Sequence, residues 1–388
     1  MKKMTALTAL SAAAMAIPSQ VQAEAAPTAE TLSYRYTQYQ EADAPRARTF
    51  TPDVKRYQID IQQIGYQTPV GDSWYVSSEL QFETMSGASP TQTYKDAEGK
   101  SALIMSGASI EEQRIDAKVA PKKYFDQGTA GGLLAISSEN DYQSLALGVD
   151  GTLELFDKHT TLIGALSVSY DELSPTDANL SAARQKADGA HKRSFSIYEG
   201  INQILDKYSS LQIGVGFTQL TGYLSDPYKF EDSRPSQRDQ VTLSANHKQF
   251  MDVGEGAAMH SSYRYYFDDW GISSHTLDFE WAQSVTFGQF QFITTPRARY
   301  YTQTRANFYS LQRTPDPDRF NSSDYRLSSY GAITVGLNNK LAFKQWALHL
   351  NWQQYLSREQ LALFERDSDE TPGLVNFTSI TAGIDYKF

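Results

Sequence analysis

Apolar and polar residues alternate along most of this chain, and a period of two residues is typical of a β-strand with one apolar face. Within residues 74–82, for example, one face would hold Trp74, Val76, Leu80 and Phe82. Such runs are roughly 10–14 residues long, whereas strands of globular proteins average about 5–6 residues. We expect about sixteen strands, at 31–41, 54–67, 73–86, 109–122, 129–139, 141–154, 160–172, 192–204, 210–222, 238–250, 257–268, 272–284, 289–302, 326–340, 345–357 and 373–388.

The segments between these runs alternate in length. Short ones fall at 69–72, 156–159, 205–208 and 286–289, and long polar ones at 87–108, 173–191, 223–237, 303–325 and 358–372. This alternation, with aromatic residues at the ends of the apolar faces, is typical of outer-membrane barrels rather than of soluble β-sandwiches. We therefore predict an all-β fold over residues 31–388. It is a transmembrane antiparallel up-and-down β-barrel of about sixteen strands, with short periplasmic turns and long extracellular loops.

Both ends of the chain carry features of an exported protein. Lys2 and Lys3 precede an apolar stretch and an A-x-A-like site that ends at Ala23, so we predict a cleaved signal peptide at 1–23 and a short periplasmic leader at 24–30. At the other end, Phe388, Tyr386 and Ile384 share one face of the last run, which resembles the signal that the outer-membrane assembly machinery reads. We expect the protein in the outer membrane of a Gram-negative bacterium.

Two places interrupt the alternation. Glu199 falls on an apolar face beside Phe195 and Ile197, and the run "DIQQIGYQ" changes phase near Gln63. We interpret both as β-bulges or as positions at the level of the membrane interface.

Composition narrows the range of chemistry. The formal net charge of −10 argues against nucleic acid as a partner. The chain has no Cys, which leaves no disulfide, no thiolate metal site and no c-type haem attachment. The acidic loops lack the spacing and the glycine of an EF-hand, so we expect no metal site and no cofactor.

Several segments together resemble a known family. They are "SGAS" twice, "SENDY" at 138–142, "GYLSDPYK" at 222–229, "SYRYYFDDWGISSHTL" at 262–277 and "RYYTQTRANFY" at 299–309. Over most of the mature chain, these segments are similar to a proteobacterial outer-membrane family known as domain of unknown function 3570. The resemblance implies a barrel and an outer-membrane location, and it implies no substrate, reaction or catalytic residue.

Charged residues of both signs recur on the faces opposite to the apolar ones. The candidates for lining a lumen are Arg264, Arg297, Arg299, Glu79, Glu83, Asp278 and Glu280, and the same faces would also hold Arg35, Arg114, Asp60 and Asp116. Such residues could border a water-filled pore and set its ion preference. They could also form salt-bridged ladders that fill the lumen, and the mixture of signs slightly favours that alternative. Arg297 and Arg299, two residues apart on one strand, are the first candidates for a pore lining.

A barrel of this size can hold an aqueous channel, so the leading hypothesis is passive passage of small polar solutes or ions. This hypothesis rests on architecture rather than on a site. One alternative is a non-conducting barrel that anchors or sleeves a periplasmic or surface protein, for example a redox partner. Another is an outer-membrane hydrolase that uses Ser274 and His275. On a strand, however, His275 and Asp278 point to opposite faces, which argues against a local triad, and we expect no enzyme.

The expected partners follow from the predicted location. They are outer-membrane lipid and lipopolysaccharide around the barrel, and the assembly machinery at the last strand. A long loop such as 303–325 or 173–191 could fold inward and plug the lumen.

Overall fold

The structure is a computed structural model that describes residues 26–106, 110–366 and 370–388. The predicted signal peptide at 1–23 and its cleavage site lie outside the described residues. No helix in these three described ranges is long and apolar enough to cross a membrane.

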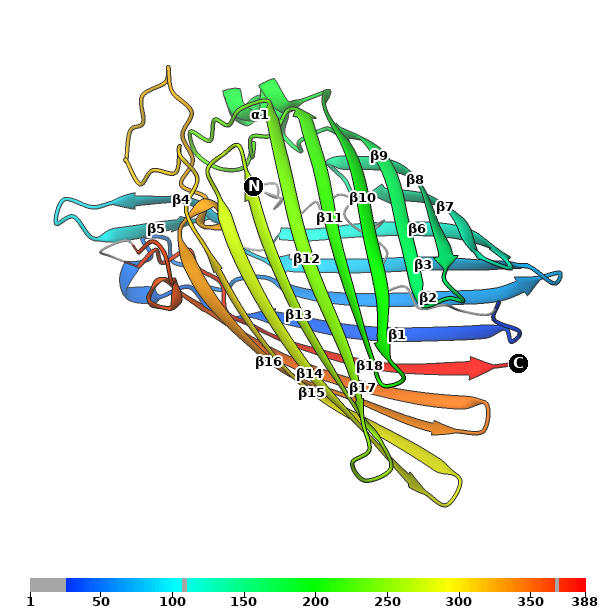
Figure 1. Cartoon of the computed structure of the whole chain (residues 1–388). Coiled ribbons are helices and arrows are strands. Elements are labelled where there is room, and N and C mark those ends of the chain that lie inside the picture. The colour runs from blue at the N-terminus through cyan, green and yellow to red at the C-terminus, as the bar shows by residue number, and fades with distance from the viewer. Residues whose placement is uncertain (1–25, 107–109, 367–369) are drawn as a thin grey trace.

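Sixteen antiparallel strands form a closed barrel, which confirms the predicted fold (Figure 1). They are β1 (Thr31–Glu41), β2 (Gln58–Val70), β3 (Trp74–Gly87), β6 (Ile110–Phe125), β7 (Gly128–Ser138), β8 (Tyr142–Leu155), β9 (Thr160–Leu173), β10 (Ala190–Asp206), β11 (Ser209–Gly222), β12 (Gln237–Met251), β13 (Ala257–Asp268), β14 (Ser273–Phe287), β15 (Phe290–Gln303), β16 (Tyr330–Phe343), β17 (Trp346–Arg358) and β18 (Phe377–Lys387). Neighbours in the ring follow the chain order, and β1 closes the ring by pairing with β18. Closure leaves no free sheet edge, so backbone N–H and C=O groups inside a membrane are hydrogen-bonded.

The predicted strand boundaries lie close to the observed ones. The largest differences are at three strand starts, predicted at 54, 326 and 373 and observed at Gln58, Tyr330 and Phe377. At these places the hydrogen-bonded pairing begins four residues later than predicted.

The two ends of the barrel differ. Tight turns such as 71–73 and 126–127 join the strands at one end, and the even strand number places Thr31 and Lys387 there as well (Figure 1). The loops at the other end carry η2 (Arg46–Arg48), β4 (Pro90–Lys95), β5 (Ser101–Met105), η3 (Ala178–Leu180), α1 (Ala182–Ala187), η4 (Tyr325–Leu327) and η5 (Glu359–Leu361). The segment 87–108, expected to be a loop, therefore contains a two-stranded hairpin that projects from the barrel.

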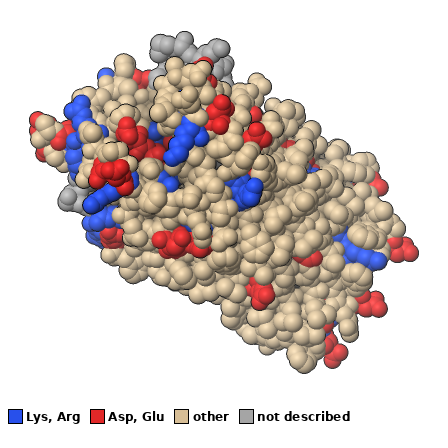
Figure 2. Space-filling model, turned by 90° about the horizontal axis from the view of Figure 1, so that it is seen from above, with Lys and Arg blue, Asp and Glu red and all other residues tan. Residues whose placement is uncertain are grey.

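The outward faces of the strands form an apolar band. On β7 and β8 the band includes Leu134, Ile136, Leu145 and Leu147, whose side chains are each about half exposed, while the inward Ala146 is buried. Figure 2 shows charged side chains gathered at the loop end, with the wide region of strands nearly free of them. An apolar outer band with charge at its margins is the surface that a barrel presents to lipid.

Glu199 interrupts this band without a bulge. It lies opposite Gly164 on β9 and Val215 on β11, and neither pairing shifts register at this point. Its side chain is exposed on the same face as Ile197 and Ile201. Because β10 continues for seven or more residues on either side, Glu199 lies near the middle of the strand. Both sequence interpretations, a bulge and an interface position, were wrong for this residue.

The interruption of the alternation near Gln63 lies in β2 and is not a bulge either. β2 pairs with β1 and β3 without a register shift, so the interpretation of a bulge near Gln63 was also wrong. Towards the loops, β2 places the apolar Ile59 on the inward face and Asp60 on the outward face. There Asp60 accepts a 2.6 Å hydrogen bond from the phenol of Tyr36, so the predicted inward position of Asp60 was wrong.

Candidate functional site

The seven residues predicted to line a lumen all lie on the inward faces of barrel strands. Outward positions on the same strands are identified by exposed apolar side chains such as Leu80 and Leu277. The seven residues are Glu79 and Glu83 on β3, Arg264 on β13, Asp278 and Glu280 on β14, and Arg297 and Arg299 on β15. The barrel brings them together in two groups on different walls.

The first group is a ladder of arginines and carboxylates on β14 and β15. The Nη2 atom of Arg297 lies 2.6 Å from Asp278 Oδ2, and its Nε atom lies 3.3 Å from Glu280 Oε1. The Nε atom of Arg299 lies 2.5 Å from the same oxygen of Asp278. Asp278 therefore joins two arginines, which is the salt-bridged arrangement that the sequence left open.

Arg264 on the neighbouring strand β13 is not part of that ladder. Its backbone pairs with Ser244 and Thr276, and its side chain is exposed on the inward face near Tyr301. Within the described parts of the chain, no carboxylate lies at ion-pair distance from its guanidinium. Arg264 is therefore the inward arginine best placed to meet a solute.

The second group surrounds Arg114 on β6. The guanidinium lies 2.9 Å from Asp116, 3.7 Å from Glu83 and 3.6 Å from Glu139. Glu112 on the same inward face accepts a 3.1 Å hydrogen bond from Asn140. Three carboxylates thus gather around one guanidinium. Towards the periplasmic end, the same wall is neutral, because it carries the two ion pairs Lys118–Glu79 (2.9 Å) and Lys122–Asp150 (3.5 Å).

The crowding of carboxylates is reflected in Glu139, which follows the last residue of β7. Burial raises the pKa of Glu139 to about 8; Arg114 opposes this rise, and the carboxylates of Asp141, Glu83 and Glu112 add to it. Like charges that share one site disfavour ionisation of one of them. Glu139 therefore gains its charge only in the mildly alkaline range.

A third ladder lies where the barrel closes. The guanidinium of Arg35 on β1 lies 2.5 Å from Asp385 on β18, and the imidazole of His349 on β17 lies 2.7 Å from the same carboxylate. Arg35 therefore faces inward as the sequence predicts, and it is paired. Among the described residues, no group of three or more His, Cys, Asp or Glu side chains could hold a metal ion.

The extracellular loops do not project freely from the rim. The backbone N–H of Phe230, in the β11–β12 loop, donates to the carbonyl of Thr91 in the β4–β5 hairpin at 2.9 Å. The N–H of Thr93 in this hairpin donates to the hydroxyl of Ser323, in the β15–β16 loop, at 3.2 Å. Four strands of the ring separate the hairpin from each of these loops. The three segments 88–106, 223–236 and 304–329 therefore meet across the mouth, and we call them the cap.

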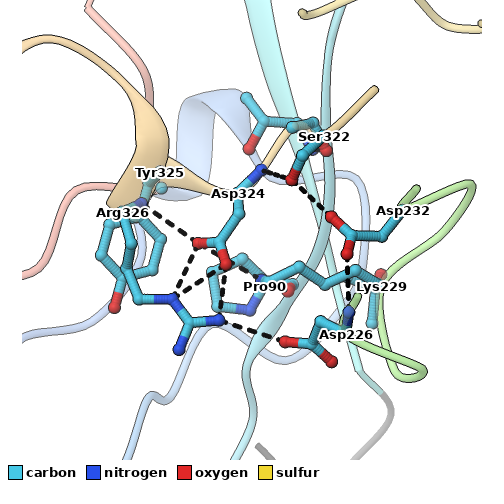
Figure 3. Close-up of polar contacts among 12 residues, drawn as sticks. Pro90, Asp226, Lys229, Asp232, Ser322, Asp324, Tyr325 and Arg326 are labelled. Atoms are coloured by element: carbon cyan, nitrogen blue, oxygen red, sulfur yellow. Dashed lines mark hydrogen bonds and ion pairs between the residues drawn. The ribbon is translucent and has the colours of Figure 1, made fainter. Parts of the chain in front are cut away.

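Six charged residues join the segments of the cap, and Figure 3 labels all of them except Arg234. They are Asp226, Lys229, Asp232 and Arg234 from one loop, and Asp324 and Arg326 from another. Asp324 lies 2.5 Å from Arg326, 2.9 Å from Arg234 and 3.9 Å from Lys229. Lys229 also donates a 2.9 Å hydrogen bond to the carbonyl of Pro90, which attaches the hairpin to the cluster. We call these six residues the cap cluster.

The cap cluster is electrically balanced and shielded from water. Its three acids face three bases, and Asp226, Lys229, Asp232 and Asp324 are each at most 9 % exposed. Burial opposes the ionisation of Asp324, but Arg326, Lys229 and Arg234 outweigh that effect and hold its pKa well below the ordinary value. Removing one member would leave a buried charge without compensation, which is the costly way to break such a network.

Ser274 and His275, the candidates for a hydrolase, do not form a pair. Ser274 is buried on the inward face of β14, and the adjacent His275 faces outward. The Nδ1 atom of His275 is hydrogen-bonded to the hydroxyl of Tyr263 at 2.7 Å, and the ring packs against Tyr265 and Phe364. The two side chains therefore occupy opposite faces of the wall, as strand parity predicts.

The sequence did not reveal the cap cluster. The segment "LSDPYKFEDSRPSQRD" mixes charges and prolines, which indicates an ordered loop but not its partners. Asp324 belongs to one of the acidic loops, and its basic partners Arg234 and Lys229 lie about a hundred residues earlier in the sequence. Mixed charge next to proline in two separate loops is the only signal that could have suggested the contact.

Comparison with known proteins agrees with the architecture. The family model described as "Protein of unknown function (DUF3570)" matches residues 6–376. No curated protein matches the chain.

Solved structures with the same architecture have very different sequences. A bacterial polysaccharide outer membrane secretin has a TM-score of 0.52 at 9% identity, and the match covers 92% of this chain and 98% of that chain. CdiB from Acinetobacter baumannii has a TM-score of 0.51 at 8% identity, and the match covers 92% of this chain and 60% of that chain. The outer membrane protein opdK from Pseudomonas aeruginosa has a TM-score of 0.41 at 8% identity, and the match covers 94% of this chain and 100% of that chain. At such identities the likeness to the first two shows the fold of outer-membrane barrels and no more.

Proposed function

This chain belongs to the DUF3570 family, whose function is unknown, and we propose that it is a passive channel for small polar solutes or ions in the outer membrane of a Gram-negative bacterium. The observation that supports this function is the inward face of the barrel. It carries charged ladders on three walls and the exposed guanidinium of Arg264, whereas the outward face is apolar. A polar interior within sixteen strands suits a water-filled passage.

The proposed location brings its own partners. The apolar band would contact lipid and lipopolysaccharide, and the assembly machinery would read the last strand, where Tyr386 and Phe388 pack edge to face with ring centroids 4.9 Å apart. Residues 1–23 would serve as the export signal.

The cap makes the extracellular entrance the narrow point of the proposed channel. Its segments cross the mouth, and the balanced cap cluster holds them there. Opening of the cap would then control passage. The same observation supports a second candidate, a non-conducting barrel that sleeves or anchors a periplasmic or surface protein, because a permanently closed mouth passes no solute.

Planar-bilayer recording separates the two candidates. We would compare the wild type with Asp324→Asn, which removes the acid that three bases of the cap cluster share. A channel predicts conductance steps for the wild type and a higher open probability or larger steps for the variant. If neither protein conducts, although both keep the heat-dependent gel shift of a folded barrel, the channel proposal fails. A protein that then co-purifies with the silent barrel would support the sleeve.

A further inference from the structure

The wall formed by β13, β14 and β15 carries an excess of positive charge. Its inward arginines are Arg264, Arg297 and Arg299, and its inward carboxylates are Asp268, Asp278 and Glu280; Asp268 is paired with Arg238 of the neighbouring strand β12 at 2.5 Å. Apart from that pair, three guanidiniums face two carboxylates. The unpaired charge is on the side of Arg264, whose exposed guanidinium lies on the inward face.

The wall formed by β3, β6 and the end of β7 carries the opposite excess. Around Arg114 lie the carboxylates of Glu83, Asp116 and Glu139. Even when Glu139 is protonated, two carboxylates remain for one guanidinium.

These two walls lie opposite each other. In the ring order, β6 and β14 are separated by eight steps in either direction around the sixteen strands. The groups also lie at similar depth: Glu83 is four residues from the extracellular end of β3 at Gly87, and Arg264 is four residues from the end of β13 at Asp268. Neither feature is visible in the linear sequence, because only closure of the barrel sets which strands face each other.

From this opposition we infer that the lumen below the cap is a charge-separated constriction that favours small solutes carrying a cationic and an anionic group, such as zwitterions, over neutral solutes of the same size. The inference rests on the proposed channel function and specifies its solute class. Arg264 would meet the anionic end of the solute, and the carboxylates around Arg114 would attract the cationic end.

The physical basis is a field directed across the passage. Two walls of opposite sign orient a dipolar solute and lower its free energy in the lumen, whereas a neutral isomer gains little. Salt screens such a field, with a Debye length of about 30 Å at 0.01 M and about 3 Å at 1 M ionic strength. The preference should therefore be strong at low salt and disappear at high salt, which a purely steric filter would not show.

The test uses two isomers, zwitterionic β-alanine and neutral lactamide, in liposome-swelling assays with the full-length mature barrel. Arg264→Gln and Glu83→Gln each remove one charge from opposite walls. Lys123→Gln is the control. Lys123 also lies on β6, but it faces outward, and its ammonium nitrogen lies 5.4 Å from the ring centroid of the outward Trp74. Each protein is first checked for the heat-dependent gel shift of a folded barrel, and the Asp324→Asn background is used if the wild-type cap admits neither isomer.

The expected result has two parts. Each wall variant should lower the β-alanine to lactamide rate ratio by about twofold at low salt, and Lys123→Gln should leave it unchanged. In bilayers under a KCl gradient, Arg264→Gln should shift selectivity towards K⁺ and Glu83→Gln towards Cl⁻. If the barrel conducts but both variants behave like Lys123→Gln, the inference is wrong and the channel proposal stands. If the barrel conducts ions but neither isomer enters through the wild type or the Asp324→Asn background, the inference is wrong and the channel proposal stands; if neither protein conducts, both fail.

Discussion

The cap cluster permits a quantitative test with Asp324→Asn. The substitution keeps the size of the side chain and removes the charge that lies within 4 Å of three bases, Arg326, Arg234 and Lys229. Three bases, of which Lys229 is buried and Arg326 is about one-third exposed, would then face two acids, Asp226 and Asp232. Breaking a buried ion pair by removing one partner costs about 3–5 kcal/mol, and we expect the lower end of this range because Asn can still accept hydrogen bonds.

The cost should appear as local opening of the cap rather than as unfolding of the barrel. The cluster joins loops, while the strands have their own continuous hydrogen-bond ladders. A loss of about 3 kcal/mol increases the open population on the order of a hundredfold. Hydrogen–deuterium exchange of peptides covering 223–236 and 321–327 should accelerate accordingly, and peptides from β11 and β16 should not change.

Asp316→Asn is the matched control from the same loop. Asp316 pairs with Arg319 at 3.5 Å, but the two side chains are 52% and 83% exposed, so its removal should cost less than about 0.5 kcal/mol. Equal exchange rates in Asp324→Asn and the wild type would refute the argument that this carboxylate holds the cap.

Acid provides a further check on Asp324. Because the pKa of Asp324 is depressed in the folded protein, its stabilisation is present above pH 3.8 and is lost as pH falls from there through the folded pKa.

Three further predictions concern other parts of the molecule. Glu199→Leu should raise the free energy of unfolding in lipid by about 1–2 kcal/mol, measured by urea titration, because it removes a carboxylate from the middle of the apolar band; a loss of stability would contradict this. The raised pKa of Glu139, about 8 against 4.5, means that the wild type loses stability as pH rises through that window. Glu139→Gln should therefore unfold at a higher temperature than the wild type at pH 9 and at nearly the same temperature at pH 4. If the difference in unfolding temperature between variant and wild type is the same at both pH values, Glu139 is not a buried, crowded carboxylate. Phe388→Ala should reduce the amount of heat-modifiable protein in the outer membrane several-fold, and normal assembly would refute the role proposed for the terminal aromatic residue.

The faces of individual strands could be predicted because alternation is a local property. Glu79, Arg264 and Arg299 all lie inward as their parity indicates, since successive side chains of a strand must point to opposite sides. The errors at Asp60 and Glu199 have one cause. Both side chains are polar but lie on the outward face, which is otherwise apolar. Alternation alone cannot distinguish such a residue from a bulge or from a strand whose inward and outward positions have been exchanged.

The sequence by itself determined the number of strands, their approximate ends and their inward and outward faces, because each follows from a repeat of two residues and from turn length. Only the tertiary structure decided which charges meet. Closure sets β6 opposite β14, and folding of the loops brings Asp324 to Lys229, which is 95 positions earlier in the chain. Pairing of charges depends on distance in space, and for loops rooted on separate strands that distance is fixed by the closed barrel rather than by any local pattern.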